Sequence, residues 1–248
     1  YNGKAVVTTP DKPAGLGKNI QFSDVKKFAL EHNLPILQPE KLKSQEFLDQ
    51  LGEINADLFV VVAFRMLPKV VWALPKCGTI NLHAALLPDY RGAAPINHAI
   101  INGETETGIT TFYIDEEIDT GKVIIQEKCP IQPKDNIGTL YDKLMEIGAD
   151  AVCRTVDIIA QGNVNAIEQD EIRTENLHPA PKITKEFCQI DWNGKAEDIH
   201  NLVRGLSPYP AAWCYIKDDL TIKVFKTSFS VEKHNLAAGT FVSANKSF

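Results

Sequence analysis

The feature that most constrains the fold of this 248-residue chain is an uninterrupted apolar run, Leu58–Phe64 (LFVVVAF). A short run of β-branched and aromatic residues is typical of a strand that is covered on both faces, as in a parallel sheet. The next strand expected from the pattern is Thr79–His83 (TINLH). The run therefore predicts a central, buried strand of an α/β domain.

Helices and further strands alternate around this run. A helix is expected from Ser23, a suitable N-cap, to about Asn33. Strands are expected at Ile109–Ile114 and Lys122–Gln126, and the clearest helix is Thr139–Ala160, whose apolar residues recur with a period near 3.6. This alternation predicts an open, mostly parallel, Rossmann-like sheet.

The composition and the apolar pattern of the sequence change after residue 176. We expect a catalytic domain over 1–176, a proline-containing linker over 177–190, and a smaller C-terminal β domain over 191–248. Short alternating segments such as AAWCYIK and LTIKVFKTSFSV are typical of hairpins. We expect this second domain to be an OB-like β-barrel.

Composition excludes some function classes. The 26 Lys and Arg against 32 Asp and Glu give a net charge of −6, which argues against non-specific nucleic-acid binding. The stretch Lys12–Lys27 is nevertheless locally basic. The five cysteines form no CxxC pair, so free thiols in a reducing compartment, by default the cytoplasm, are expected. No apolar run approaches the roughly 20 residues that span a bilayer, so no membrane association is expected.

Candidate catalytic residues lie at the end of the TINLH strand. Asn81 and His83 are two residues apart, so their side chains project from the same face. An amide donor beside an imidazole suits stabilisation of an oxyanion and delivery of a proton. Asp119 in EEIDTG is the candidate carboxylate, with Asp89 and Asp115 as competitors. On spacing alone, a hydrogen-bonded structural pair and an ordinary turn aspartate explain the same residues.

The long run from Asn81 to Gly121, NLHAALLPDYRGAAPINHAIINGETETGITTFYIDEEIDTG, resembles the core motif of the formyltetrahydrofolate-dependent formyltransferases. The segments TTPDKPAGLGK, APKITKE and RGLSPYPAAW extend the resemblance over nearly the whole chain, in the order of that family. The match is closest to the branch that formylates methionyl initiator tRNA.

The resemblance implies an enzyme in which Asn81, His83 and Asp119 form the catalytic set: Asn81 and a protonated His83 stabilise the oxyanion, and Asp119 raises the pKa of His83. It implies 10-formyltetrahydrofolate as co-substrate, no metal, methionyl initiator tRNA as acceptor, and a monomer. Folate contacts are expected from Ala85, Leu86, Leu87, Pro88, Arg65, Met66, Leu67, Ile114, Asp115 and Ile118. Contacts with tRNA are expected from Lys12, Lys18, Lys182 and Lys185.

Two alternatives and three departures accompany the resemblance. The same core would suit formylation of a nucleotide-linked amino sugar, or a folate- or RNA-binding module without turnover. Ala85 stands where the family mostly has Ser, and Leu16 where it usually has a basic residue. The family's first strand and the last part of its β domain are not in the sequence, so an incompletely represented chain is expected.

Several other residues have simpler interpretations. Arg91 is expected to shape the loop PDYRGAAP, and His178 reads as an ordinary surface residue. His98 is a possible metal partner of His83, but no third ligand has suitable spacing, so a core or surface histidine is expected. Trp213 and Tyr209 could stack on a base, although packing between the domains is the expected role.

Overall fold

The computed structural model describes residues 1–14, 19–63, 65–173, 175–217 and 219–243. The chain divides into two compact units: unit 1 is residues 1–81 with 113–116, and unit 2 is residues 82–112 with 117–248. The sheets are open and mixed, with parallel and antiparallel pairs. In the described ranges no helix is long and apolar enough to cross a membrane.

Unit 1 consists of short strands and three helices. In chain order they are β1 (Val6–Val7), β2 (Lys12–Ala14), β3 (Asn19–Gln21), α1 (Asp24–Glu31), β4 (Ile36–Leu37), α2 (Gln45–Ile54), β5 (Phe59–Val62) and α3 (Lys69–Trp72). β1 pairs with β4 in parallel, and β2 pairs with β3 antiparallel. Ser23 caps α1 by accepting a hydrogen bond from the Lys26 backbone N–H at 3.2 Å, which confirms the predicted helix start.

The faces buried in unit 1 differ from the expectation. Phe59 of β5 packs on an apolar cluster formed by residues of α2, α3 and their neighbours, but Val60 and Val62 are 45% and 55% exposed. The strand thus buries one face, and the prediction of cover on both faces is wrong for the residues described. In α1 the apolar Val25 and Phe28 are exposed, whereas Lys26 is buried. The Lys26 ammonium pairs with Asp11, which compensates its charge.

Unit 2 carries most of the regular structure. Strand β6 (Thr79–His83) begins in unit 1 and ends in unit 2. The following elements are β7 (Arg91–Gly92), α4 (Pro95–Ile101), β8 (Glu106–Tyr113), β9 (Val123–Pro130), α5 (Ile137–Ala160), the 3-10 turn η1 (Gln169–Glu171), β10 (Pro179–Ala180), α6 (Ala196–Leu206), β11 (Ala212–Lys217) and β12 (Leu220–Val224). The four-stranded sheet has the order β5-β6-β8-β9, and its β8–β9 pair is antiparallel.

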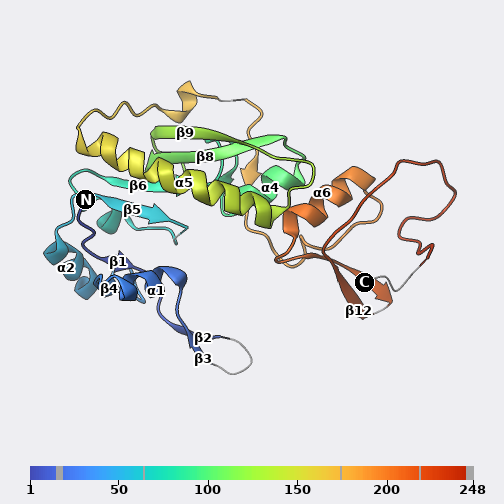
Figure 1. The fold of residues 1–248 in the computed structure, drawn as a ribbon, viewed down its shortest axis with the longest axis horizontal. Helices are drawn as coiled ribbons and strands as arrows, with labels where there is room; N and C mark the ends of the chain where they lie inside the picture. The colour runs from blue at the N-terminus through green and yellow to red at the C-terminus, as the bar shows by residue number, and fades with distance from the viewer. Residues whose placement is uncertain (15–18, 64, 174, 218, 244–248) are drawn as a thin grey trace. The chain divides into compact units, whose positions relative to one another are not determined.

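Helix α5 lies along β8 and β9 (Figure 1). Its start is fixed by a capping box between Asn136 and Thr139, and Leu140, Leu144 and Ala151 enter the main core cluster. The helix predicted at Thr139–Ala160 is confirmed and begins two residues earlier.

The C-terminal part of unit 2 has its own small core. Buried residues of α6 and β11 gather there with two residues of the preceding segment: Val203, Leu206, Ala212, Cys214, Cys188 and Ile190. β11 and β12 form one antiparallel hairpin, and residues 225–243 contain no strand. Within residues 212–217 and 219–243, the structure therefore has one hairpin followed by irregular chain. The expected OB-like barrel is not found among these residues.

Candidate functional site

His83 is the last residue of β6 and is 5% exposed. Its Nε2 lies 2.9 Å from the backbone carbonyl oxygen of Tyr90. A carbonyl oxygen only accepts hydrogen bonds, so Nε2 carries a proton and donates it to Tyr90. The other ring nitrogen, Nδ1, lies 3.6 Å from Oδ2 of Asp119. His83 is therefore held between a backbone acceptor and a carboxylate.

Asp119 occupies the turn between β8 and β9 with a left-handed backbone, φ 58°. Its Oδ2 accepts a hydrogen bond from the Gly92 backbone N–H at 3.0 Å. The backbone of the turn is held by Gln169, whose Nε2 donates to the carbonyl oxygens of Asp119 and Gly121, both at 2.9 Å. Arg91 donates in turn to Oε1 of Gln169 through Nε at 3.0 Å and Nη2 at 2.6 Å.

Gln169 is only 2% exposed and was missed by the sequence reasoning. It lies 50 residues beyond Asp119 in the chain, and no local pattern marks it. Arg91, expected to shape the loop PDYRGAAP, binds Gln169 and through it supports the turn that carries Asp119.

Burial sets the electrostatics of His83. Desolvation lowers the pKa of His83 below its ordinary value of 6.5, while the nearby charge of Asp119 and the hydrogen bond to Tyr90 act to raise it. The sequence reasoning included only the raising effect of Asp119, and that effect is outweighed by burial. His83 is consequently neutral at pH 7, with an unprotonated Nδ1 facing Asp119.

Asn81 is the last residue of the first segment of unit 1 and precedes His83 by two residues on β6. Its side-chain oxygen is buried and makes no hydrogen bond with any residue the structure describes. A buried polar atom without a partner costs about 1–3 kcal/mol and calls for an explanation such as a functional role.

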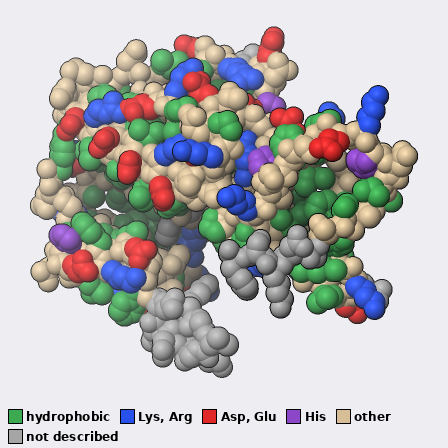
Figure 2. Space-filling model, turned by 45° about the vertical axis from the view of Figure 1, so that its right-hand side comes forward, with side chains coloured by type: hydrophobic (Ala, Val, Ile, Leu, Met, Phe, Trp, Pro, Cys, Tyr) green, Lys and Arg blue, Asp and Glu red, His purple; other side chains and the backbone are tan. Residues whose placement is uncertain are grey.

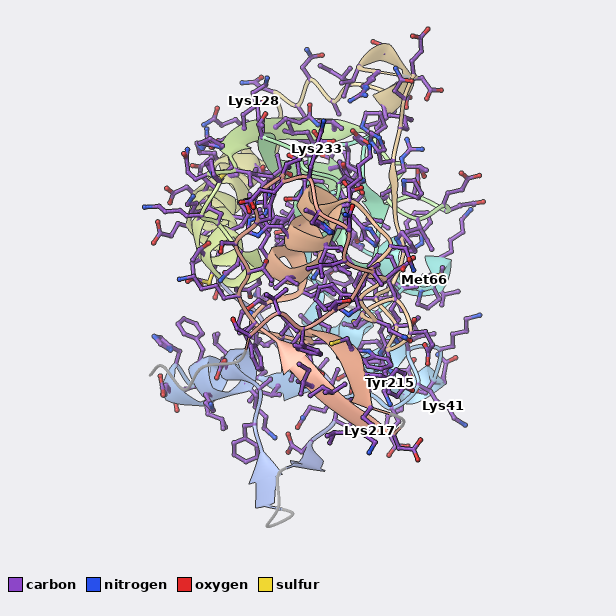
Figure 3. The ribbon with its side chains drawn as sticks, turned by 90° about the vertical axis from the view of Figure 1, so that its right-hand side faces the viewer. Lys41, Met66, Lys128, Tyr215, Lys217 and Lys233 are labelled. Atoms are coloured by element: carbon purple, nitrogen blue, oxygen red, sulfur yellow. The ribbon has the colours of Figure 1, made fainter. Side chains whose placement is uncertain are left out.

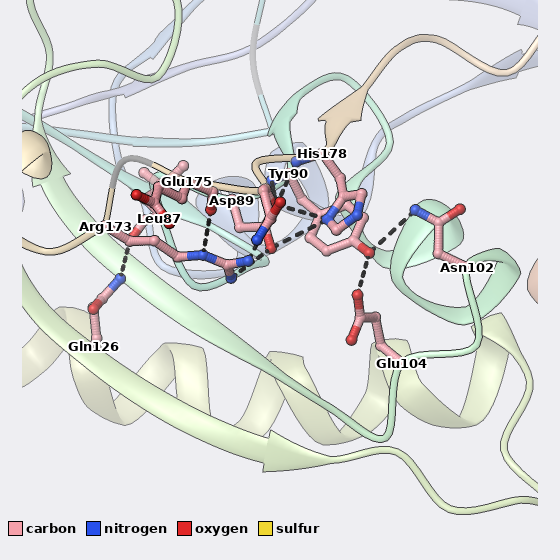
Figure 4. Close-up of polar contacts among 10 residues, drawn as sticks. Leu87, Asp89, Tyr90, Asn102, Glu104, Gln126, Arg173, Glu175 and His178 are labelled. Atoms are coloured by element: carbon pink, nitrogen blue, oxygen red, sulfur yellow. Dashed lines mark hydrogen bonds and ion pairs between the residues drawn. The ribbon is translucent and has the colours of Figure 1, made fainter.

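The competing carboxylates have other places. Asp89 accepts hydrogen bonds from the backbone N–H groups of Tyr90 and His178 and pairs with Arg173 (Figure 4). Asp115 belongs to unit 1. Asp119 is the carboxylate that the structure places beside His83.

A metal role for His98 finds no support. Its Nε2 lies 2.9 Å from the carbonyl oxygen of Pro181, and its ring contacts Phe187 edge-on. Within the described ranges, no group of three or more His, Cys, Asp or Glu side chains could hold a metal ion.

Several of the unit 2 residues expected to contact folate are buried. Ala85 and Leu87 are 0% and 1% exposed and belong to core clusters, so neither residue is open to a ligand, and the expected folate contacts from these two are not supported. Pro88 is buried and Leu86 half-buried, whereas Ile118 is 59% exposed.

The folate residues expected in unit 1 are more open. Arg65 and Met66 line a hollow of about 300 Å³ with Leu42, Lys43 and Pro68. Met66 is 68% exposed and stands at the surface (Figure 3). Leu67 packs on the unit 1 core, and the Ile114 N–H donates to the carbonyl oxygen of Thr79 at 2.8 Å; Asp115 follows it.

The residues expected to contact tRNA are only partly described. Leu16 and Lys18 lie outside the described residues, as does the side chain of Lys12. Lys182 and Lys185 are exposed, and the Lys185 ammonium lies 5.7 Å from the centre of the Trp213 ring. Tyr215 and Lys217 are exposed on the β11–β12 hairpin (Figure 3). Elsewhere on the surface, basic and acidic side chains are interspersed over the face in view (Figure 2).

Family models match both parts of the chain. The model described as "Formyl transferase" matches residues 2–156, and "Formyl transferase, C-terminal domain" matches residues 182–247. The chain belongs to the formyl transferase family.

Individual relatives agree with this assignment. The methionyl-tRNA formyltransferase of Bacteroides fragilis is 53% identical over 253 residues, which cover 100% of this chain and 78% of that protein. The methionyl-tRNA formyltransferase of Flavobacterium johnsoniae is 51% identical, with 99% and 78% covered. Among solved structures, WlaRD, a sugar 3N-formyl transferase crystallised in the presence of dTdp and 5-N-Formyl-THF, is 25% identical with a TM-score of 0.57, covering 73% of this chain and 61% of that one.

Proposed function

We infer that this formyl transferase moves the formyl group of 10-formyltetrahydrofolate to the amino group of methionyl initiator tRNA. The observation that carries the inference is identity of 53% with a methionyl-tRNA formyltransferase over the whole chain. The pairing of His83 with Asp119 at the end of β6 supports it, because ligands of open α/β sheets bind beyond the carboxyl ends of strands.

The reaction forms one carbon–nitrogen bond and breaks another. The methionyl amine attacks the formyl carbon on N10 of the folate, and the carbonyl electron pair moves to oxygen. The amine loses a proton, N10 gains one, and the bond between the formyl carbon and N10 breaks as the carbonyl re-forms. No electrons are exchanged with an outside oxidant or reductant.

Asn81 and His83 have different chemical roles in this proposal. The Asn81 amide donates a hydrogen bond to the oxyanion, a contribution that is typically worth a hundredfold or more in rate. His83 is neutral before the reaction, so Nδ1 can accept the proton released by the amine. Asp119 stabilises the imidazolium that results, and the imidazolium returns the proton to N10.

The co-substrate and the domain roles belong to the same proposal. We propose Arg65, Met66 and Leu67 among the folate contacts, and a 25% identical relative crystallised in the presence of 5-N-Formyl-THF supports a folate co-substrate. We propose residues 1–176 as the catalytic domain, 177–190 as linker and 191–248 as the C-terminal domain. Lys182, Lys185 and the β11–β12 hairpin are the proposed tRNA-facing surface, on a cytoplasmic monomer.

A direct assay tests the function. The protein is incubated with 10-formyltetrahydrofolate and either methionyl initiator tRNA or a dTDP-linked amino sugar, and the formylated product is measured under single-turnover conditions. We expect formylation of the tRNA and none of the sugar, and we expect His83→Asn to slow formylation of the tRNA by about 10²–10⁴-fold. Formylation of the sugar alone, or folate binding with no transfer to either acceptor, would reject the proposal.

A further inference from the structure

We propose that Asp89 and His178 are positioning residues for His83 and act on it through the backbone of Tyr90. The catalytic consequence rests on the function proposed above. The link begins at the Tyr90 carbonyl oxygen, which accepts the hydrogen bond from Nε2 of His83 at 2.9 Å. Whatever fixes that carbonyl also fixes which nitrogen of His83 carries the proton.

Tyr90 does not hold its conformation by itself. Its φ of 59° lies in the left-handed region, which a bulky aromatic residue seldom adopts unless its surroundings impose it. The direction of its carbonyl is therefore a property of the neighbouring contacts, and those contacts come mainly from Asp89 and His178.

Asp89 joins the Tyr90 backbone to a segment far along the chain (Figure 4). Its Oδ1 accepts from the backbone N–H of Tyr90 at 3.2 Å and from that of His178 at 2.6 Å. Nδ1 of His178 lies 3.2 Å from the same oxygen, and Nη1 of Arg173 lies 3.1 Å from Oδ2. The Tyr90 N–H also donates to the carbonyl oxygen of His178 at 2.8 Å.

The Tyr90 side chain is held from two further directions. Its ring stacks on the imidazole of His178, with centres 5.3 Å apart and planes 21° from parallel. Its hydroxyl donates to Oε1 of Glu104 at 2.7 Å and accepts from Nδ2 of Asn102 at 3.2 Å. With its N–H and its side chain both held, Tyr90 can redirect its carbonyl only by rotation about the Cα–C bond.

The consequence for His83 concerns its tautomer. A fixed Tyr90 carbonyl keeps the proton on Nε2 and leaves Nδ1 unprotonated beside Asp119. Loss of the Asp89 carboxylate frees the carbonyl, and the other tautomer then gains population, with its proton between Nδ1 and Asp119. Arg173 and His178, which complete the arrangement, lie between the two segments that match the family models.

The test measures the His83 tautomer directly. In the full chain without ligands, ¹⁵N NMR of the histidine rings should show His83 protonated on Nε2 in the wild type, and a mixture of tautomers in His178→Gln and in Asp89→Ala, which removes the oxygen that accepts from both N–H groups. Turnover should fall roughly tenfold or more with KM for both substrates unchanged, because misplacement of a catalytic group chiefly affects the chemical step.

The matched control is His98→Asn. His98 also binds a backbone carbonyl in the segment that follows residue 178, but it has no contact with Tyr90 among the interactions described. It should leave both tautomer and turnover unchanged, with denaturant unfolding confirming that all variants are folded.

Two outcomes decide the proposal. An unchanged His83 tautomer in both folded Asp89 and His178 variants overturns it, and so does an equal change in His98→Asn. Should Asp89→Ala fail to fold, His178→Gln alone decides. If the wild type proves inactive while the tautomer still responds, the proposed function fails and the positioning link stands, since the NMR measurement needs no turnover.

Discussion

Among the residues that the structure describes in unit 2, two carboxylate–imidazole pairs differ in burial and in what surrounds the carboxylate. In Asp119–His83 both side chains are largely buried, at 13% and 6% exposed, and the atoms are 3.6 Å apart. In Asp89–His178 the imidazole is 43% exposed, and the carboxylate already serves two backbone N–H groups and Arg173. In the proposed function the shielded pair transfers a proton, whereas the Asp89 carboxylate, whose acceptor positions are already used, holds backbone in place.

The largest difference between the pairs should appear on removal of each histidine. His83→Asn is expected to lower turnover by about 10²–10⁴-fold, since it removes the proton-transferring group. His178→Gln should cost far less, because that imidazole acts only through Tyr90. Single-turnover rates measure both, and similar losses in the two variants would erase the distinction.

The next effect tests the amide that shares the strand with His83. Asn81→Ala should lower turnover by about 10²–10³-fold with folate affinity little changed, because the hydrogen bond is made in the transition state. Binding of folate is measured by fluorescence quenching. A large loss of affinity with normal turnover of bound substrate would show that Asn81 serves binding.

Replacing the Asp119 carboxylate tests how its charge affects the pKa of His83. Asp119→Asn should lower turnover by roughly a hundredfold and lower the pKa of His83 further, because the charge of Asp119 acts to raise that pKa. NMR titration of the His83 ring measures the change. A higher pKa in the variant would contradict the assigned electrostatics.

A backbone position between the pairs should affect stability. A Cβ at Gly92 would overlap the Ala180 carbonyl oxygen, and its φ is 130°, so Gly92→Ala should lower the free energy of unfolding by about 2–3 kcal/mol. Gly52→Ala is the matched control, because nothing lies within 4 Å of a Cβ there and the residue is inside α2. It should raise stability by about 0.5–1 kcal/mol. Equal effects in denaturant titrations would contradict the close approach at Gly92.

The smallest expected effect is the contribution of His83 to the dependence of stability on pH. Its pKa in the folded protein is below 6.5, so the unfolded chain binds the proton more readily. The stabilising contribution is complete above pH 6.5 and is lost as the pH falls from there through the lower folded-state pKa. His83→Asn should flatten this part of the stability profile, and an unchanged profile would mean that the pKa is not depressed.

The sequence predicted those features that depend on neighbours in the chain. The cap at Ser23 and the helix α5 follow from local pattern, and the two-residue spacing of Asn81 and His83 places them on one strand. The partner of His83 could be narrowed to three aspartates, but only the folded chain places Asp119 beside it.

What could not be predicted depends on long-range contacts. Gln169 reaches Asp119 across 50 residues and His178 reaches Asp89 across 89 residues, and no periodicity marks either one. The direction of the His83 pKa shift could not be predicted, because it depends on how deeply the folded chain buries the imidazole. The exposed face of β5 could not be predicted either, because it depends on which elements pack against the strand.

The most direct test of the central claim is the single-turnover rate of formyl transfer to methionyl initiator tRNA as a function of pH, in the wild type and in His83→Asn. We predict that the wild-type rate rises with pH through one ionisation below 6.5, as His83 loses its proton, and that this step disappears with the imidazole. A residual rate in the variant that keeps the same ionisation would contradict the account, because another group would then carry the proton.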